Sequence, residues 1–345
     1  MDRIKVVIVS DDLTGLLDSA VGFARREIEV IAVTSPAHLK EIGSNNSSVL
    51  AVSTNSRELL EDQAIDLISD VSKTAPSFLN AVVFKKIDSR MKGHIAAEVA
   101  VLRKTKQPVI LCPAIPKLGR IVKDEFLLGQ GVDEPIAVSG VIPDALVPDA
   151  QTDADIDQII AKAPTNTLFV GAAGLAEGLA RKIAGGEKSA LFDAIPAPIL
   201  LAIGSRDPVT LKQLEGLAVE SAPNGAVDLG IDNNIIRMTA GTEAIDGTMA
   251  NARFAKGIAQ RIEAQNIETL VASGGETAAA IMAELGAHSL QVIGEVLPGL
   301  PVSRVLGLKR PLMLITKSGG FGAEDTLKKV LALAGQDALK KGIHG

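Results

Sequence analysis

The sequence predicts an α/β protein with two domains, each a mostly parallel sheet flanked by helices. Short β-branched runs recur along the chain, and each ends in polar residues before an apolar-periodic helical segment. The length of 345 residues exceeds one average domain. Residues 185–198, rich in Gly, Pro and charge, separate two such series. We therefore predict one domain over residues 1–190 and a second over residues 198–345.

The composition excludes several classes of function. Apolar residues make up 47% of the chain and charged residues 22%, as in globular proteins. The net charge of −6 and the lack of Trp and Tyr argue against nucleic acid or an anionic membrane as a partner. We find no secretory signal and no apolar run long enough to span a membrane, and a single cysteine, Cys112, permits no internal disulfide. These features predict a cytoplasmic enzyme or binding protein.

The first predicted strand, residues 6–9, ends in two adjacent acids, Asp11 and Asp12. Thr14 and Gly15 follow, at the start of a predicted helix. Ligands of open α/β sheets bind outside the carboxyl ends of the strands. Paired acids at that edge can hold Mg²⁺ or take a proton from a hydroxyl. One Asp can instead cap the helix, but the pair together favours a functional site.

Strands are predicted over residues 30–33 and 49–52, and the latter opens into a polar loop that carries Arg57 and starts a helix over residues 58–71. Arg57 can form a two-pronged contact with a substrate carboxylate. It can equally be a solvated arginine in the first turn of that helix. The sequence alone leaves both interpretations open.

A fourth strand, residues 81–84, leads into a predicted loop over residues 85–93 with four cations, one acid and one hydroxyl, before a helix over residues 95–103. This density of charge predicts a site for an anionic ligand. A fifth strand, residues 108–112, precedes a loop in which two prolines exclude a helix and Gly119 allows a sharp turn that presents Arg120.

Residues 121–166 show no clear pattern, whereas residues 168–170 form a predicted strand with a helix reaching residue 183. The turn between them, residues 171–176, consists mainly of small residues. Such a turn permits a ligand to approach the backbone closely, but tight packing of helix on strand explains it slightly better.

Three strands in the second half, residues 199–203, 270–272 and 312–315, each end in a turn with glycine and a hydroxyl before a helix. Those helices are expected from about residue 209, over 278–285 and over 325–334. Backbone N–H groups at such turns, with the helix dipole behind them, form anion sites. Three of them together, one with Lys317, predict a polyphosphate ligand.

Other phosphate-handling folds fit poorly. The chain has no GxxxxGK[ST] sequence, and the first strand does not carry GxGxxG, which argues against a Rossmann dehydrogenase. A haloacid-dehalogenase-type phosphatase requires an aspartate nucleophile two residues before a second aspartate, where this chain has Ser10.

Short motifs occur at the ends of the predicted strands in both halves of the chain. They are DDLTG from Asp11, KxDS from Lys86, PAxPxxGR ending at Arg120, GxAGLA from Gly171, the GS turn Gly204-Ser205, SGGET from Ser273 and KSGxFG from Lys317. Taken together, these motifs resemble those of the four-carbon acid sugar kinases, and the match covers both halves in the same order. The resemblance implies an N-terminal acid-sugar domain, a C-terminal ATP domain, and transfer of the γ-phosphate to the terminal hydroxyl of threonate, erythronate or 3-oxo-tetronate, with ATP and Mg²⁺ as cofactors.

The chain departs from this pattern where the family usually has DSTLRG. It has Asp88-Ser89-Arg90-Met91-Lys92-Gly93 there, so a threonine is lost and an arginine becomes Lys92. Lysine cannot reproduce the planar contact of arginine, although Arg90 can supply it from another position. The chain is also several tens of residues shorter than most members. Both differences bear on the identity of the substrate.

The resemblance and the charges give an expected role to each site residue. Asp12 is the first candidate for the base, Asp11 the next, and the metal ligands remain undefined. The expected substrate-binding residues are Asp11, Asp12, Arg57, Lys86, Asp88, Ser89, Arg90, Lys92, Gly93 and Arg120. The expected nucleotide-binding residues are Ser205, Gly274, Gly275, Glu276, Thr277, Lys317, Gly319, Gly320 and Gly322.

The expected partners are a small sugar acid and ATP, without nucleic acid or membrane. A homodimer is compatible with the sequence, which does not decide the oligomeric state. Two other functions remain open. One is a kinase for a longer or nitrogen-bearing hydroxy acid, and the other is a nucleotide- or metabolite-sensing protein without turnover.

Overall fold

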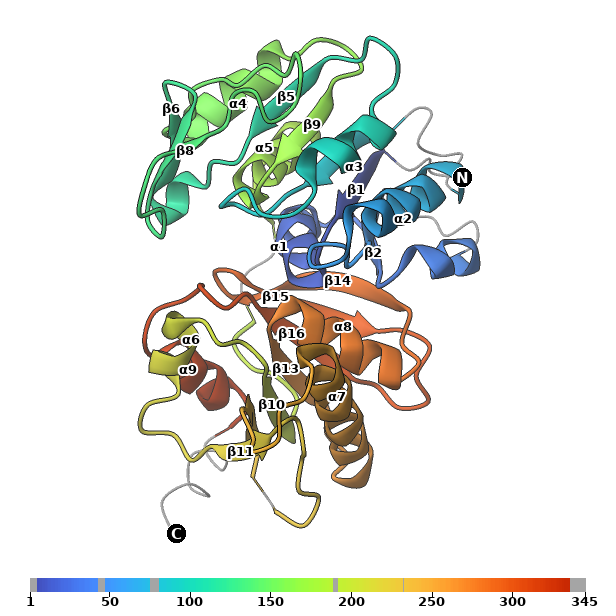
Figure 1. Cartoon of the computed structure of the whole chain (residues 1–345), viewed down its shortest axis with the longest axis vertical. Helices are drawn as coiled ribbons and strands as arrows, with labels where there is room; N and C mark the ends of the chain where they lie inside the picture. The colour runs from blue at the N-terminus through green and yellow to red at the C-terminus, as the bar shows by residue number, and fades with distance from the viewer. Residues whose placement is uncertain (1–4, 43–46, 75–80, 189–191, 232, 336–345) are drawn as a thin grey trace. The chain divides into compact units, whose positions relative to one another are not determined.

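The computed structural model describes residues 5–335 except residues 43–46, 75–80, 189–191 and 232. The chain divides into two compact units, Met1–Ser189 and Ala190–Gly345 (Figure 1). Each unit contains a mostly parallel sheet with helices against it, so the predicted fold class is confirmed.

Parallel strands form the sheet of the N-terminal unit, in the order β2-β3-β1-β4-β9-β5. The central strand β1 lies between β3 and β4, and Ser10 is in register with Ser53 and Lys86. The carboxyl ends of these three strands therefore meet at one edge of the sheet. The strands are β1 (Val6–Ser10), β2 (Val30–Val33), β3 (Val49–Ser53), β4 (Val82–Lys86), β5 (Val109–Cys112) and β9 (Leu168–Gly171).

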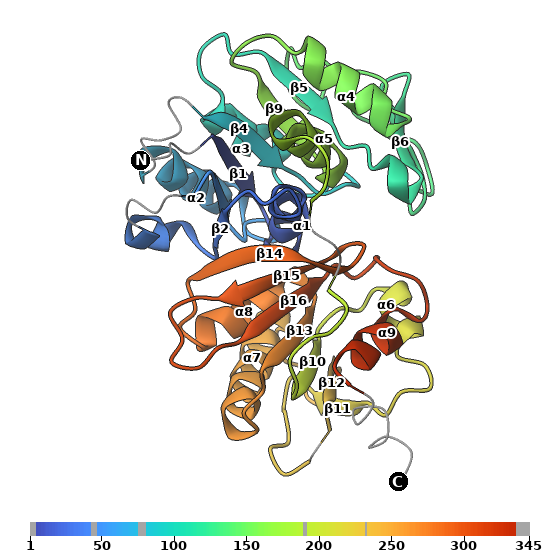
Figure 2. The ribbon, with the colours of Figure 1, turned by 180° about the vertical axis from the view of Figure 1, so that it is seen from behind.

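Helices cover both faces of this sheet, which explains why β1 and β3 are buried along their whole length. Helices α1 (Leu13–Ala24) and α5 (Ala173–Ala184) pack against each other, as do α2 (Glu61–Thr74) and α3 (Ile95–Leu102). The first pair lies nearer the viewer in Figure 2 and the second pair in Figure 1.

The small-residue turn after β9 serves close packing. A Cβ atom added at Gly171 would clash with the carbonyl oxygen of Cys112, and one at Gly174 with that of Ala114. The interpretation of tight helix–strand packing is therefore correct for this turn.

Two details of the predicted N-terminal elements were wrong. Strand β4 extends to Lys86, so Lys85 and Lys86 belong to the strand and not to the loop that follows. Helix α2 begins at Glu61, so Arg57 lies in the loop before the helix and not in its first turn.

The prolines after β5 do not exclude a helical turn, because a proline at the first helical position loses no hydrogen bond. A 3₁₀ turn, η3, spans Pro116–Leu118, and a second, η1, spans Pro36–Ile42. The segment without a clear pattern contains an antiparallel sheet, in the order β6-β7-β8, and α4, which packs on α5. These elements are β6 (Arg120–Lys123), β7 (Phe126–Gly129), β8 (Ile136–Ala137) and α4 (Asp153–Lys162).

The strands of the C-terminal unit follow the order β11-β12-β10-β13-β16-β15-β14. The first five are parallel, and the hairpin β14–β15 adds two antiparallel strands beside β16. The strands are β10 (Ile199–Ile203), β11 (Glu220–Pro223), β12 (Ile235–Thr239), β13 (Thr269–Ser273), β14 (Ser289–Leu297), β15 (Leu300–Val305) and β16 (Met313–Lys317).

Helix α6 packs against α9 and α7 against α8 in this unit. These helices are α6 (Pro208–Gln213), α7 (Gly247–Ala264), α8 (Gly275–Glu284) and α9 (Thr326–Leu333). The predicted loop at residues 274–277 is largely the first turn of α8. Among the described residues, no helix is both long enough and apolar enough to cross a bilayer.

Candidate active site

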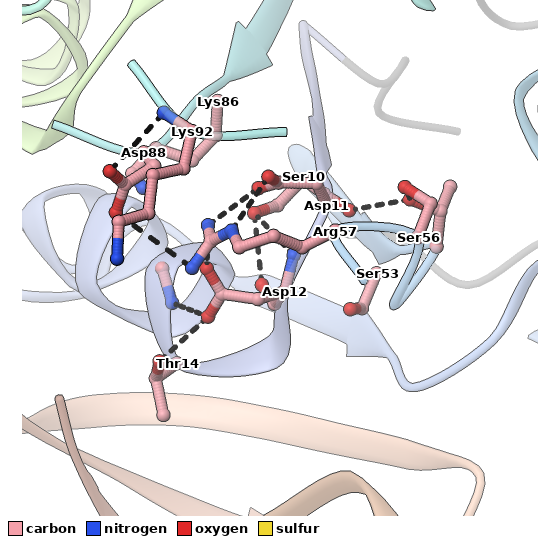
Figure 3. A network of polar contacts seen from close by, with 12 residues as sticks. Ser10, Asp11, Asp12, Thr14, Ser53, Ser56, Arg57, Lys86, Asp88 and Lys92 are labelled. Carbon is pink, nitrogen blue, oxygen red and sulfur yellow. Dashed lines mark hydrogen bonds and ion pairs between the residues drawn. The ribbon is translucent and has the colours of Figure 1, made fainter. Parts of the chain in front are cut away.

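Asp12 performs two tasks at the carboxyl end of β1. Its backbone is extended and its Oδ1 caps α1, accepting hydrogen bonds from the Gly15 N–H (2.7 Å) and from the Thr14 hydroxyl (2.6 Å). Its other oxygen, Oδ2, accepts a hydrogen bond from Arg57 Nη2. The helix-cap interpretation is thus correct for one carboxylate oxygen, while the second belongs to a charged cluster (Figure 3).

Arg57 lies at the centre of that cluster. Its Nε and Nη2 donate to the two carboxylate oxygens of Asp11, both at 2.8 Å, and Nη1 lies 3.8 Å from Asp88 Oδ2. The Arg57 N–H also donates to the Asp11 carbonyl. The arginine from the loop after β3 therefore forms the predicted two-pronged contact, but with carboxylates of its own chain (Figure 3).

This cluster keeps the Asp12 carboxylate ionised. Burial alone would raise the pKa of Asp12. The charges of Arg57 and Lys86 and the hydrogen bonds from Gly15 and Thr14 outweigh burial, and lower this pKa from 3.8 to about 2. Burial would likewise lower the pKa of Arg57, but the neighbouring carboxylates raise it, so its guanidinium stays charged.

Two consecutive lysines at the end of β4 point to different surroundings, because side chains alternate across a strand. The ammonium of Lys86 lies over the first turn of α1, where a Cβ added at Gly15 would come within 2.6 Å of it and 2.9 Å of Asp12 Oδ2. Lys85 is completely buried on the other face and forms an ion pair with Glu98 of α3 at 2.7 Å. Only Lys86 is therefore a candidate ligand for an anion.

The loop after β4 folds around Asp88. Its Oδ1 accepts hydrogen bonds from the backbone N–H groups of Arg90 (2.9 Å) and Lys92 (3.5 Å), and both of these residues are exposed. Gly93 has a φ of +89°, and a Cβ atom there would lie 2.9 Å from Asp11 Oδ2. Glycine is thus required where this loop passes the cluster.

Arg120 holds the same loop from the other side. Its Nη1 donates to Ser89 Oγ (2.6 Å), and its Nε and Nη2 donate to the Gln130 carbonyl (3.0 and 2.8 Å). Burial and the nearby charge of Arg90 lower the pKa of Arg120. Because three of its N–H groups bind protein oxygens, Arg120 positions Ser89 and has fewer donors left for a substrate.

The sequence analysis missed a buried chain of polar residues behind Arg57. The second carboxylate oxygen of Glu98 accepts a hydrogen bond from Ser56 Oγ, which lies 2.8 Å from Thr54 Oγ1. Thr54 Oγ1 in turn donates to the Ser10 carbonyl at 3.0 Å. These residues belong to three separate elements, and no spacing in the sequence connects them.

The pair Asp11 and Asp12 does not fit a metal ion held between two carboxylates. Arg57 already pairs its positive charge with both carboxylates, and Lys86 adds a second positive charge beside Asp12, so the charge at this place opposes a divalent cation. Across the described part of the chain, no group of three or more His, Cys, Asp or Glu side chains is arranged to hold a metal. The interpretation of this pair as a magnesium site is therefore unsupported.

In the C-terminal unit, the three predicted turns are neighbours, because β10, β13 and β16 are adjacent and parallel. The N–H groups of Gly204 and Ser205 donate to the Ser273 carbonyl, both at 3.0 Å, and the Gly274 N–H donates to the Lys317 carbonyl at 3.1 Å. The turns after β10 and β13 are thus each bonded to the end of the neighbouring strand.

Glycines let these turns approach one another. A Cβ atom at Gly204 would clash with Thr277 Oγ1, and one at Gly319 with Ser205 Oγ. Gly274 has a φ of +109° and directly precedes α8, whose first turn contains Gly275, Glu276 and Thr277. Gly320 lies near Asp207, and Gly322, with a φ of +90°, packs against Thr326.

Lys317 does not extend from its turn. It is the last residue of β16 and is completely buried, and its ammonium donates to Thr210 Oγ1 and to two backbone carbonyls. The residues that the sequence predicts to bind the nucleotide are thus close together in space. Lys317, the cation among them, is buried below the turns that carry the others.

The comparisons with known proteins divide the chain in a similar way. Residues 6–143 match the family described as sugar-binding N-terminal domain, and residues 232–327 match the family described as nucleotide-binding C-terminal domain. A D-threonate kinase from Bordetella bronchiseptica is 26% identical, over 93% of this chain and 95% of its own length. A 3-oxo-tetronate kinase from Brucella melitensis is 23% identical, over 96% of both chains.

Solved structures show the same fold. A protein described as a putative tRNA synthase from Salmonella typhimurium superimposes with a TM-score of 0.72, at 19% identity, over 95% of this chain and 99% of its own. A Haemophilus influenzae protein superimposes with a TM-score of 0.67, at 16% identity, over 95% of this chain and 100% of its own.

Proposed function

Because the chain belongs to the family whose members join a sugar-binding N-terminal domain to a nucleotide-binding C-terminal domain, we propose that it is a sugar-acid kinase. The reaction is transfer of the γ-phosphoryl group of ATP to the terminal hydroxyl of a four-carbon acid of the threonate, erythronate or 3-oxo-tetronate type. Relatives named D-threonate kinase and 3-oxo-tetronate kinase align with nearly the whole chain.

The observation that carries the proposal is the arrangement at the carboxyl ends of β1, β3 and β4. One carboxylate with a lowered pKa, Asp12, lies beside two buried or half-buried cations, Arg57 and Lys86. A sugar acid has both groups that this arrangement recognises. Its carboxylate pairs with a cation, and its hydroxyl donates a hydrogen bond to an ionised carboxylate.

Each residue then has a defined task. Lys86 binds the carboxylate of the sugar acid. The exposed side chains of Arg90 and Lys92, in the loop after β4, can add further positive charge to this contact. Asp12 Oδ2 accepts the hydrogen bond of the reacting hydroxyl and takes its proton as the new P–O bond forms. Arg57 holds Asp11 and Asp12 in place and keeps them ionised.

ATP is proposed as the donor, bound at the turns after β10, β13 and β16. Backbone N–H groups at the start of helices favour phosphate oxygens. Mg²⁺ is proposed to enter with the nucleotide on its phosphates, as is usual for this ion, and not between Asp11 and Asp12. We further propose a cytoplasmic location, where ATP is available, and a homodimer as the assembly to test by light scattering.

The test is ADP formation with purified protein, ATP and a panel of acids. We expect turnover with at least one of D-threonate, D-erythronate and 3-oxo-tetronate, and a phosphorylated product by mass spectrometry. Turnover with longer hydroxy acids alone would overturn the four-carbon assignment. ATP binding without turnover for any acid would instead identify a sensing protein.

A further inference from the structure

Lys317 is a buried cation without a carboxylate partner in the described part of the chain. Its ammonium donates to three neutral oxygens, Thr210 Oγ1 (2.8 Å), the Ser318 carbonyl (3.2 Å) and the Gly319 carbonyl (3.1 Å). An ammonium has three N–H groups, so all of its donors are used. Direct contact of Lys317 with a phosphate would require it to release one of these oxygens.

The bonds to the two carbonyls fix the direction of the turn after β16. In a trans peptide the C=O and N–H groups point to opposite sides. With the carbonyls of Ser318 and Gly319 drawn toward Lys317, the N–H groups of Gly319 and Gly320 point away from it. Within the described ranges, these two N–H groups donate to no protein acceptor. They are therefore free for an anion.

Thr210 strengthens this arrangement from α6. Its hydroxyl donates to the Gly319 carbonyl at 2.7 Å while it accepts from Lys317, and it is itself completely buried. Thr210 and Lys317 are 107 positions apart in the chain. Together they hold the inner side of one turn and leave its outer side unpaired.

We infer that Lys317 and Thr210 are positioning residues that aim the N–H groups of Gly319 and Gly320 at the nucleotide phosphates, without touching the phosphates themselves. This inference rests on the proposed function, since it takes the C-terminal unit as the nucleotide site. It differs from the expected role of Lys317 as a direct phosphate ligand.

The charge of Lys317 makes a second contribution. Burial lowers its pKa from 10.5 to about 8, and the acid that opposes this effect is Asp207, the N-cap of α6. The paired residue on β13, Ser273, is neutral, as is Thr210. A phosphate bound on the far side of the turn favours the charged form, so it raises this pKa. Nucleotide binding should then be accompanied by proton uptake near pH 8.

Calorimetric titration with ADP distinguishes a Lys317 that positions the turn from a Lys317 that contacts the phosphate directly. If Lys317 acts through the turn, Thr210→Val should weaken ADP binding about tenfold or more, although Thr210 touches no phosphate, and Thr210→Ser should restore it. Lys317→Met should weaken binding to a similar extent, and the double variant should be little worse than either single variant, because both remove one arrangement. Lys309→Met, which removes an exposed charge in the same unit, is the matched control.

Other outcomes would contradict the positioning role of Lys317 and Thr210. Wild-type affinity in Thr210→Val, together with a large loss in Lys317→Met, would show that Lys317 contacts the phosphate directly. If Lys317→Met does not fold, Thr210→Val and Thr210→Ser decide by themselves, because over the residues that the structure describes Thr210 reaches the turn only through Lys317 and the Gly319 carbonyl. Wild-type affinity in Thr210→Val would then overturn the inference. In the wild type, ADP affinity should also fall by up to about tenfold per pH unit as pH rises above 8, and a flat profile between pH 7 and pH 9.5 would contradict the contribution of the Lys317 charge. No ADP binding by the wild type would refute the proposed function instead.

Discussion

Lys85 and Glu98 form a buried ion pair, with Nζ and Oε2 separated by 2.7 Å and both side chains almost completely shielded from water. Lys85 also donates to the Lys86 carbonyl, and Glu98 accepts from Ser56, the residue before Arg57. One ion pair therefore connects the strand that carries Lys86 with the loop that carries Arg57.

Breaking this pair should destabilise the N-terminal unit. Glu98→Leu leaves the Lys85 ammonium buried without a counter-charge, which costs about 3–5 kcal/mol. Lys85→Met combined with Glu98→Leu removes both charges and should recover much of that loss. Urea unfolding followed by circular dichroism measures it, since the chain has no Trp or Tyr. A single variant as stable as wild type would contradict the predicted cost.

Lys86→Met should act mainly on the substrate. We expect it mainly to raise KM for the sugar acid, because Lys86 supplies a positive charge for the substrate carboxylate, while Arg57 still pairs with Asp12 in the variant. Replacing the substrate carboxylate by a primary alcohol should then reduce kcat/KM much more in wild type than in the variant. Equal reductions in both proteins would show that Lys86 does not contact the carboxylate.

Asp12→Asn separates chemistry from helix capping. Asparagine keeps an oxygen that can accept from Gly15, so α1 retains its cap. Loss of the charge should lower kcat by roughly a hundred- to ten-thousand-fold, with a small change in KM. Asp246→Asn is the matched control, because Asp246 caps α7 through Thr248 in the same way. Near-normal turnover in Asp12→Asn would end the catalytic assignment.

The low pKa of Asp12 predicts how stability depends on pH. A carboxyl group with a pKa of about 2 in the folded protein and 3.8 unfolded contributes stability that is present above pH 4 and is lost as pH falls toward 2. The wild type should thus lose about 1 kcal/mol more than Asp12→Asn between pH 5 and pH 3. If the urea midpoints of the wild type and Asp12→Asn fall by the same amount between pH 5 and pH 3, the charges of Arg57 and Lys86 do not lower the pKa of Asp12 as described.

Gly274→Ala tests the nucleotide turns. Its φ of +109° is a conformation that alanine rarely adopts, so the added methyl group strains the backbone directly before α8 and should shift the N–H groups at the start of that helix. We expect ADP affinity to fall at least about tenfold while D-threonate binding is retained. Gly307→Ala has a similarly positive φ with open space around it, so it reports the effect of the same backbone strain away from the nucleotide turns. Equal ADP affinity in the two variants would contradict the assignment.

Much of the fold could be predicted because its signals are local. Strand β1, for example, is a run of four β-branched residues ended by Asp11 and Asp12, and a helix cap depends on Asp12, Thr14 and Gly15 alone. Helix α7 and the hairpin β14–β15 were not predicted. In β14, half-buried and buried residues alternate only over the first half, and the alternation is lost at the bulges after Val292, so the period of two does not run along the whole strand.

The sequence by itself determined the fold class and the edge of the N-terminal sheet at which the charged residues gather, because strand ends and helix starts depend on neighbouring residues. Only the tertiary structure decided how those charges pair. Arg57 binds Asp11 across 46 positions, and Lys317 turns inward to Thr210 across 107. Of the two adjacent lysines at the end of β4, Lys86 faces the site and Lys85 faces Glu98. Both faces of β4 are buried, so its pattern could not distinguish them, and only the packing of α1 and α3 made that choice.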